Sequence, residues 1–572
     1  MPESSRREKP PSGSPTNDPG ETTGISAGES QSSPENQSES FDSSKMRKTK
    51  PGIKRLSLTL SVLFSFILGF PFLLKSVEIY RSPLPFKYMD SLSSVIESEP
   101  LLFPCQFQAV FLGFRDELND ADKLGISIVE RMREVVGNDQ ACGSCRSNFT
   151  VSISLETEKG CVQSNNGKIG CSWQCELLKD NDFDAKWKDD EYVDGLLENA
   201  VSGSQKCAGS KGKVYSVVVV KNDEEVRAVA GKHRHGWIIG KVSEAEAVER
   251  IAEIFVRVFM NGGKDEGSIH GEFMPVGADG RVVLSFSLLN SNPHDWIYDW
   301  DFQRVNEIQL TPIVEALAPI ANISVESQIL YHTPKSFSSY WDYQRDAYIY
   351  DSKDLPFFMW GGVIVWNPSG CSGHSETLRE ARHTISFKDL ENIVDVFMGQ
   401  LRQLFGLKSE SLYAGSSGIV NLLASERGFT EWELDLLARQ HTCFNLQSCA
   451  TTLGSLSRLV QSLPRMIIKD EIGKQVQYSL HAANFARSNA TLGAYDDSAV
   501  LSRQARSLAE DAFFHPSIMS VSYYSFEHCF AVYSPFFLPV ALHVLLAAFK
   551  EWKRYKQEKL KYLTWKAKEV AS

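Results

Sequence analysis

The sequence LSLTLSVLFSFILGFPFLL occupies Leu56 to Leu74, and CFAVYSPFFLPVALHVLLAAF occupies Cys529 to Phe549. Neither run contains a side chain that is charged at neutral pH, and each is close to the roughly 20 residues that cross the hydrocarbon layer as a helix. About fifty mostly polar residues precede the first run, which favours an uncleaved signal anchor over a cleavable signal peptide. We therefore predict a two-pass membrane protein with transmembrane helices over 53–76 and 529–549.

The lysine and arginine residues beside these runs indicate the orientation of the chain. None lies between Ser507 and His528, whereas eight follow the second run: Lys550, Lys553, Arg554, Lys556, Lys559, Lys561, Lys566 and Lys568. The first run is preceded by Arg47, Lys48, Lys50, Lys54 and Arg55 and followed by Lys75, Arg81 and Lys87. Cytoplasmic flanks of membrane spans carry the excess of Lys and Arg. We therefore predict that both termini are cytosolic and that 75–528 face the lumen of the secretory pathway.

Acceptor triplets for N-glycosylation agree with this orientation. They begin at Asn148, Asn322 and Asn489, all between the two apolar runs. A further triplet at Asn36 lies in the predicted cytosolic tail, where the transferase cannot reach it. The three lumenal asparagines are the predicted glycosylation sites.

Cysteine usage also favours a lumenal domain. Ten of the eleven cysteines lie between the runs, and an even number in an oxidising compartment predicts disulfides. The candidates are Cys142, Cys145, Cys161, Cys171, Cys175, Cys207, Cys443 and Cys449. The last two are close enough in sequence for a local bridge, if geometry allows. Zinc binding by the first cluster, or a redox C-x-x-C at Cys142 and Cys145, is a less favoured alternative in this compartment.

Composition separates the chain into a disordered tail and a folded remainder. With 42% hydrophobic and 23% charged residues over 572 positions, the chain can bury a substantial core. Its formal net charge of -11 argues against a nucleic-acid partner, which would require a basic surface. Residues Met1 to Ser44 are dominated by Ser, Pro, Glu, Gly and Asn. We predict a disordered cytosolic tail over 1–52.

Between the spans, the pattern predicts a lumenal mixed α/β domain over 77–428 and a lumenal helical part over 429–528. Strands are predicted at Gln106–Phe114, Thr150–Leu155, Val214–Val220, Gly236–Val242, Arg281–Leu289, Ile323–Tyr331 and Gly362–Trp366. Helices are predicted at Glu244–Met260, Phe302–Leu317, Phe387–Leu404, Glu431–His441, Leu446–Ser462, Lys474–Arg487 and Ala499–Phe514. Three of them begin after the N-cap residues Ser243, Ser386 and Thr430. A basic cytosolic tail over 550–572 completes the predicted organisation.

Two segments contain residue types that could support chemistry. Gly370-Cys371-Ser372-Gly373-His374 could present a nucleophile beside an imidazole, but it lacks the G-x-S-x-G pattern and follows a turn signal. His233-Arg234-His235 could contribute to a metal site, but a solvated hairpin between strands is favoured. Because no Walker A, Rossmann, H-E-x-x-H or EF-hand pattern is present either, we predict no catalytic, cofactor-binding or metal residues.

His543 is the titratable side chain deep within the second run. Such residues usually face protein rather than lipid, because exposure to hydrocarbon is costly. The sequence therefore predicts that His543 contacts a partner helix, in preference to a role in proton transfer.

Several ordered segments resemble the PIG-S family, the S subunit of glycosylphosphatidylinositol (GPI) transamidase, in its plant-type form. They are Tyr80-Arg81 with Leu84-Pro85, Leu288-Leu289-Asn290 followed by Pro293, Trp296 and Trp300, Ser327 to Tyr331, Ala509 to Ser517, and Phe530 to Pro539. Together they extend from about Tyr80 to the end of the second span. The cysteine-rich stretch from Cys142 to Cys207 matches no pattern of the family.

This resemblance implies a noncatalytic component of an endoplasmic reticulum membrane complex that attaches GPI anchors to proteins. In that family the nucleophilic cysteine belongs to a separate caspase-like subunit, PIG-K, and PIG-T, PIG-U and a GAA-type subunit are also present. Membrane lipid is a further expected partner, and no cofactor is expected. The alternatives are a membrane-anchored lumenal hydrolase using Cys371 or Ser372, and a cargo-binding receptor.

Overall fold

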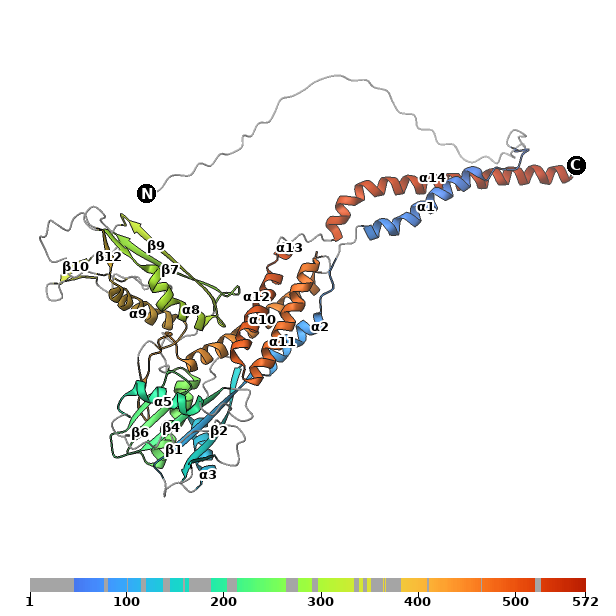
Figure 1. Cartoon of the computed structure of the whole chain (residues 1–572). Helices are drawn as coiled ribbons and strands as arrows, with labels where there is room; N and C mark the ends of the chain where they lie inside the picture. Colours follow the sequence, from blue (N-terminus) through green and yellow to red (C-terminus); the bar gives the residue numbers. More distant parts are fainter. Residues whose placement is uncertain are drawn as a thin grey trace, which may run out of the picture. The chain divides into compact units, whose positions relative to one another are not determined.

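The computed structural model describes residues 46–76, 81–99, 101–114, 120–136, 145–157, 160–163, 187–202, 213–263, 276–290, 297–333, 339–342, 347–350, 364, 366, 382–408, 411–463, 466–519 and 526–571. The chain divides into two compact units (Figure 1). One unit comprises Met1–Glu78 together with Phe530–Ser572, and the other comprises Ile79–Cys529. Each is considered by itself.

The larger unit contains an eight-stranded mixed sheet with the order β13-β14-β5-β6-β4-β1-β2-β3. Its strands are β1 (Leu101–Leu112), β2 (Cys145–Thr157), β3 (Gly160–Gln163), β4 (Val214–Lys221), β5 (Arg227–Ala230), β6 (His235–Gly240), β13 (Leu412–Gly415) and β14 (Gly418–Leu422). The central strands β2, β1, β4 and β6 run parallel, and Ala109 of β1 pairs with both Ile153 and Val217. Strand β14 pairs in parallel with β5, so a segment from far along the chain completes the sheet.

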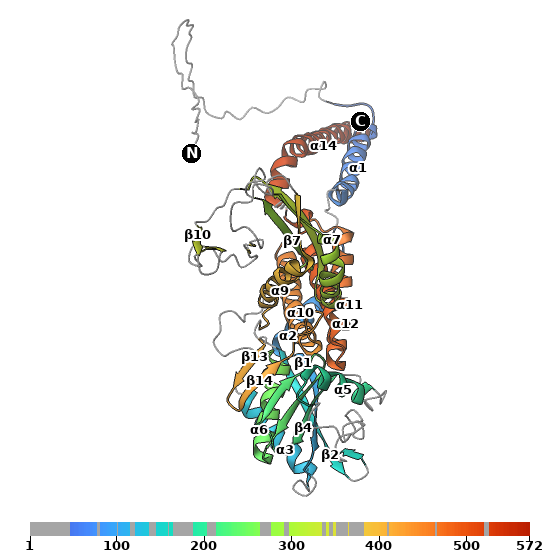
Figure 2. The ribbon, with the colours of Figure 1, turned by 60° about the vertical axis from the view of Figure 1, so that its left-hand side comes forward.

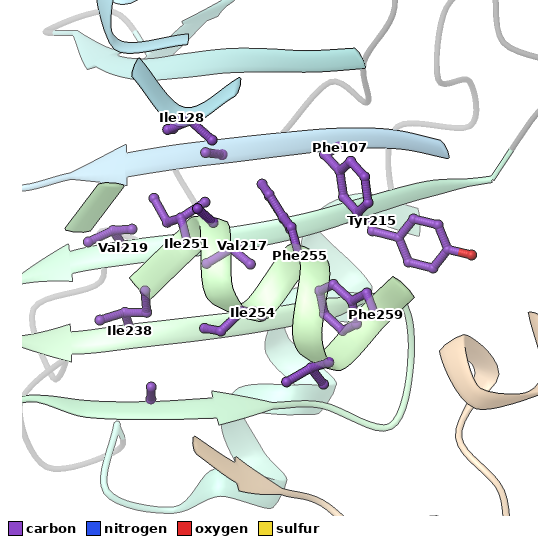
Figure 3. Packing of buried hydrophobic residues seen from close by; sticks show 14 of the residues in the cluster. Phe107, Ile128, Tyr215, Val217, Val219, Ile238, Ile251, Ile254, Phe255 and Phe259 are labelled. Atoms are coloured by element: carbon purple, nitrogen blue, oxygen red, sulfur yellow. The ribbon is translucent and has the colours of Figure 1, made fainter. Parts of the chain in front are cut away.

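Helices cover both faces of this sheet. Helices α3 (Ala121–Val136) and α6 (Glu244–Glu253), with the π-helix η2 (Ile254–Met260), pack on one face, and α5 (Asp190–Ser202) packs on the other. The aromatic rings of Phe107 and Phe255 lie 4.5 Å apart between centroids in the first core (Figure 3). The run of valines in β4 is buried on both sides, which is typical of parallel strands under two helical layers.

The tight turn between β13 and β14 is built around a buried carboxylate. Glu253 of α6 is 4% exposed and accepts hydrogen bonds from the backbone N–H groups of Ser416 (2.7 Å) and Ser417 (2.9 Å). A methyl group at Gly415 would overlap this carboxylate. Glycine at this position therefore permits the close approach that attaches the hairpin to α6.

A second α/β layer is formed by two pairs of strands and four helical segments. Strand β7 (Arg281–Asn290) pairs in parallel with β9 (Asn322–Tyr331), and β8 (Ile297–Trp300) pairs in parallel with β12 (Arg382–Ile385). The helical segments are α7 (Phe302–Val305), η4 (Asn306–Leu310), α8 (Thr311–Leu317) and α9 (Phe387–Leu404), and a separate hairpin is formed by β10 (Ser339–Asp342) and β11 (Ala347–Tyr350). The core of this layer includes Leu436 and Leu437 of the following helix α10 (Glu431–Ser462).

The helical part consists of α10, α11 (Asp470–Leu492), α12 (Tyr495–Phe513) and the short α13 (Pro516–Met519), joined by α2 (Phe86–Ser98) from the other end of the unit. Figure 2 shows α2, α10, α11 and α12 side by side. Alanines at the contacts, among them Ala483, Ala486, Ala505 and Ala509, are fully buried. Small side chains allow these helices to pack closely. The helical C-terminal part predicted from the sequence is confirmed, whereas the contribution of α2 was not predicted.

The predicted helix starts are confirmed by capping hydrogen bonds. The side chains of Ser243 and Ser386 accept from backbone N–H groups three residues further on, at 3.3 and 3.2 Å. Thr430 and Glu433 form a reciprocal capping box, with distances of 3.4 and 2.9 Å. The helix after Thr430 is longer than predicted, because Glu431–His441 and Leu446–Ser462 belong to the single helix α10.

The predicted local bridge between Cys443 and Cys449 is wrong. Cys449 has a free, fully buried thiol whose Sγ atom lies 3.4 Å from the hydroxyl of Ser479. Both cysteines belong to α10, where six residues span about 9 Å of helix axis. That separation exceeds the roughly 4.4–6.8 Å between the Cα atoms of a disulfide.

The smaller unit contains α1 (Lys54–Ser76) and nearly all of α14 (Phe526–Ala571). Within the described residues, one helix, over Ala531–Ala571, is long and apolar enough to cross a membrane by length and composition. The guanidinium of Arg47, just before α1, donates to the carboxylate of Glu558 on α14. This ion pair joins the flanks of the two apolar runs.

Candidate functional site

The predicted hairpin at His233-Arg234-His235 contacts the helices α5 and α10. It joins β5 to β6, and His235 is only 3% exposed, so the prediction of a solvated hairpin is wrong for this side chain. Its Nε2 lies 3.0 Å from Oδ1 of Asp194, and its Nδ1 lies 3.8 Å from Oε2 of Glu198. Because both ring nitrogens face carboxylates of α5, His235 is poorly placed to accept a proton from a hydroxyl or thiol nucleophile.

Asp194 is ionised in this arrangement. Burial alone would raise its pKa, but the hydrogen bond and charge of His235 outweigh burial and lower the pKa below its usual value. The backbone N–H of Lys232 donates to the same carboxylate at 3.0 Å. These contacts fix the hairpin against α5.

The next residue, Arg234, pairs with a carboxylate inside the protein. Asp435 of α10 has a fully buried side chain, and Arg234 approaches it with Nε at 2.6 Å and Nη2 at 3.1 Å. Nζ of Lys213 at 2.6 Å and the hydroxyl of Tyr215 at 3.1 Å also donate to Asp435. Burial would raise the pKa of Asp435, but the charge and hydrogen bonds of Arg234, with those of Lys213, lower it. The aspartate therefore stays charged at neutral pH.

Arg439, one turn further along α10, reaches other elements. Its Nη2 donates to the backbone carbonyl of Phe259 at 3.0 Å, and its Nη1 lies 2.9 Å from Sγ of Cys105 on β1. The guanidinium also lies over the ring of Tyr495, 5.6 Å from the centroid, at the start of α12. Arg439 thus connects α10 with η2, β1 and α12.

Arg402 attaches the second α/β layer to the same helix. From α9, it forms a bidentate ion pair with Glu433 of the capping box and donates to the carbonyl of Gly428 at 2.8 Å. Glu433 is buried as well. We call Glu431, Glu433, Asp435 and Arg439 the charged start of α10. These side chains bind the sheet, the second layer and the helical part to one helix.

The comparison with protein families decides the identity of the chain. The model described as "Phosphatidylinositol-glycan biosynthesis class S protein" matches residues 60–359 and 359–558. The chain belongs to the PIG-S family. The match includes both the sheet strands and the charged start of α10.

Curated relatives of this PIG-S family member span most of its length. The "GPI-anchor transamidase component PIGS" of Bos taurus is 24% identical over 540 residues, covering 85% of this chain and 92% of the relative. The protein of the same description from Homo sapiens is 24% identical over 551 residues, covering 87% and 94%. A "GPI transamidase component PIG-S homolog" of Schizosaccharomyces pombe is 21% identical over 327 residues, covering 49% and 54%.

The predicted glycosylation sites of this PIG-S family member lie in three different elements. Asn148 is exposed on β2, and Asn322 is exposed at the first residue of β9. Asn489 is partly exposed in the last turn of α11. Side-chain accessibility at these positions is compatible with a glycan, most clearly at the first two.

Other predicted residues are only partly covered by the structure. The side chains of Cys142, Cys145, Cys161, Cys171, Cys175 and Cys207 lie outside the described residues, as does the segment from Gly370 to His374. His543 is exposed on α14, with Nδ1 2.8 Å from the carbonyl oxygen of Pro539 in its own helix. No group of three or more His, Cys, Asp or Glu side chains that could hold a metal ion occurs in the described part of this PIG-S chain.

Sequence reasoning missed the charged start of α10. Glu431, Asp435 and Arg439 recur every four residues in EWELDLLAR, so they share one helix face. That spacing was a usable signal, but charged stripes usually face solvent. Asp435 and Arg439 are buried and Glu431 is partly exposed, and the burial of Asp435 depends on the position of Arg234 and Lys213, which no local pattern reveals.

Proposed function

We propose that this chain is a noncatalytic component of GPI transamidase that supports attachment of GPI anchors to proteins. The observation that carries this proposal is the near full-length relationship to proteins named as components of that enzyme. The relationship covers 85% of this chain and 92% of the Bos taurus relative, and the family match over 60–558 includes the folded domain and the second apolar run.

The described side chains support a noncatalytic role. Cys105 and Cys449 are 1% and 0% exposed, and burial raises the pKa of Cys449 to about 11. Both thiols are therefore too buried to attack a substrate, since reactive cysteines are accessible. The His235–Asp194 pair resembles part of a triad, but both imidazole nitrogens face carboxylates.

The proposed mechanism is a division of labour. A transamidase must hold a peptide and a bulky lipid amine together, and alignment of this kind can lower a barrier by several kcal/mol, on the order of 7–11 in favourable cases. In our proposal the nucleophilic cysteine belongs to the caspase-like PIG-K subunit, with PIG-T, PIG-U and a GAA-type subunit as further partners. The charged start of α10 would keep the lumenal surface of this subunit rigid enough to contribute to that alignment.

The proposed topology has two transmembrane helices in the endoplasmic reticulum membrane, cytosolic termini and a lumenal domain. The ion pair of Arg47 with Glu558 supports it. Arg47 precedes Leu56 by nine residues, and Glu558 follows Phe549 by nine residues. If both apolar runs cross the bilayer, the pair places their outer flanks at a similar depth on one side.

A rescue assay tests the proposed role. Cells lacking this chain should lose surface display of a GPI-anchored reporter and regain it with the wild-type chain. Cys371→Ala, Ser372→Ala and His374→Ala should each retain substantial display, because no nucleophile is removed. Complete loss in one of these variants, with the complex assembled at normal yield, would place catalysis on this chain.

Topology and disulfides need separate measurements. In sealed microsomes, protease should remove both tails and leave the glycosylated middle protected, and mass mapping of unreduced peptides should find Cys142 to Cys207 largely oxidised. Protected tails with no endoglycosidase shift would refute the topology. Free thiols, or about one equivalent of zinc, would refute the disulfide proposal without affecting the subunit role.

A further inference from the structure

The ion pair between Arg47 and Glu558 brings together two basic segments that are distant in sequence. Glu558 uses both carboxylate oxygens, since Oε2 accepts from Arg47 and Oε1 lies 3.5 Å from Nε of Arg554. Arg554 also lies 3.6 Å from Glu551. The first two acidic side chains that follow the second apolar run, Glu551 and Glu558, are therefore paired with arginines within this unit.

The lysines beside these pairs remain exposed. Over 46–55 and 550–561 the chain has eleven Lys or Arg residues and two Glu residues, although the whole chain has a formal net charge of -11. Among the described residues, none of the following forms an ion pair: Lys48, Lys50, Lys54, Lys550, Lys553 and Lys556. We call the two segments together the basic collar.

The position of the basic collar follows from the continuity of α14. The helix runs without interruption from the apolar run into the basic segment, so a rise of 1.5 Å per residue puts Lys550 to Glu558 within about 14 Å of Phe549. Trp552 is 60% exposed at the start of this segment, and tryptophan is enriched at the interface between lipid and water. If the apolar run crosses the bilayer, this part of the helix lies at the depth of the phospholipid headgroups.

We propose that the basic collar binds the headgroups of anionic phospholipids in the leaflet that surrounds it. Lysines occur on several sides of α14, and the flank held by Glu558 adds Lys48, Lys50 and Lys54. Each Lys or Arg near an anionic surface contributes about 1 kcal/mol of attraction at low salt. Both segments, 46–55 and 550–561, contribute to the proposed site, because neither alone carries all of the basic side chains of the collar. This inference rests on the proposed membrane topology.

Spin-label measurements on the full chain in vesicles test the site. With spin-labelled phosphatidylserine and phosphatidylcholine, we expect the chain to select phosphatidylserine several-fold in 50 mM NaCl, with the preference reduced about twofold or more in 500 mM NaCl, because salt screens exposed charges. Equal association of the two lipids at low salt would overturn the proposal, even if the reporter assay shows normal GPI attachment.

Two double variants distinguish binding at a defined site from attraction by the net charge of the chain. Lys550→Gln with Lys553→Gln should lower the preference by roughly two- to fivefold. Lys566→Gln with Lys568→Gln removes the same charge about 26–29 Å from Phe549 along the helix, beyond the screening length, and should leave the preference unchanged. An equal loss in both pairs would refute a site at headgroup depth.

Glu558→Gln tests whether the two segments act together. This variant makes the chain more basic, so attraction by net charge alone would rise. If the ion pair of Arg47 with Glu558 assembles the basic collar, the preference for phosphatidylserine should instead fall. A rise would overturn the joint site. Protease protection of the tails in the same vesicles reports topology independently, so a failure of the topology and a failure of the lipid site can be told apart.

Discussion

Nε of Arg234 lies 2.6 Å from Oδ2 of Asp435, which is fully buried on α10. The arginine belongs to the hairpin between β5 and β6, and the aspartate belongs to a helix that starts nearly two hundred residues later. This contact ties the central sheet to the helical part. Removing one partner of a buried ion pair leaves the other charge without compensation, which is the basis of our first prediction.

Asp435→Asn should destabilise the chain by about 3–5 kcal/mol. The control is Asp496→Asn, because Asp496 shares the same Lys213 partner at 2.8 Å but is about half exposed. Exposed pairs contribute roughly 0–1 kcal/mol, so this variant should melt near the wild-type temperature. Thermal unfolding of the detergent-solubilised chain compares them. Similar melting temperatures for the two variants would mean that the buried pair contributes little.

The second prediction concerns acid sensitivity at His441. Burial, with the charges of Arg506 and Arg503, lowers the pKa of His441 to about 3, whereas an unfolded histidine titrates near 6.5. Between these values the unfolded chain binds a proton that the folded chain does not. Stability should therefore fall as pH decreases from about 6.5, by up to about 1.4 kcal/mol per pH unit.

His441→Gln should flatten this part of the stability profile, and His481→Gln at an exposed position of α11 should not. The lowered pKa of Asp435 acts in a separate range, because its stabilisation is present above about pH 4 and is lost as pH falls further. Melting temperatures between pH 4.5 and 7 thus isolate the histidine. Identical slopes in wild type and His441→Gln would contradict the prediction.

The third prediction compares two glycines. Gly415→Ala should destabilise the chain by about 1–3 kcal/mol, since the new methyl group would displace the buried Glu253 carboxylate from its two N–H donors. Gly195→Ala on α5 meets no atom within 4 Å and should be neutral or stabilising by up to about 1 kcal/mol. Melting temperatures shifted in the same direction by both variants would contradict the proposed role of the turn.

The fourth prediction concerns association of α14 with other subunits. His543→Leu should lower copurification of the complex, because a polar side chain facing a partner helix would be lost. Leu545→Ala lies about 200° away around the helix and should have a smaller effect. Equal recovery of partners with His543→Leu and wild type would show that this face makes no important subunit contact.

Capping residues and hydrophobic periodicity predicted the bounds of an element correctly where the two signals agreed. Helix α9 has the predicted bounds Phe387–Leu404, and strands β4, β7 and β9 differ from prediction by a residue at one end. The break predicted after His441 was wrong because Thr442 and Cys443 are buried in the continuous helix α10, and tertiary packing outweighs their weak helix propensity.

Elements completed by distant parts of the chain could not be predicted. The short hairpin β13–β14 joins the sheet through β5, and α2 finds its packing partners in the helical part, chiefly α10. The same limit applies to the charged start of α10. Its members were visible in the sequence, but Arg234, Lys213 and Arg402 come from three separate segments.

The continuity of α10 has a consequence for biosynthesis. In the proposed topology the domain is translocated into the lumen, where α2 and β1 appear early, yet their helical neighbour cannot form until synthesis has passed Glu431. The outer edge of β5 likewise stays unpaired until β14 has been synthesised. Nascent chains would therefore expose apolar helix faces and an unpaired strand edge during most of translocation, a state prone to aggregation. Release from lumenal chaperones should accordingly come late, after nearly the whole domain has been translated.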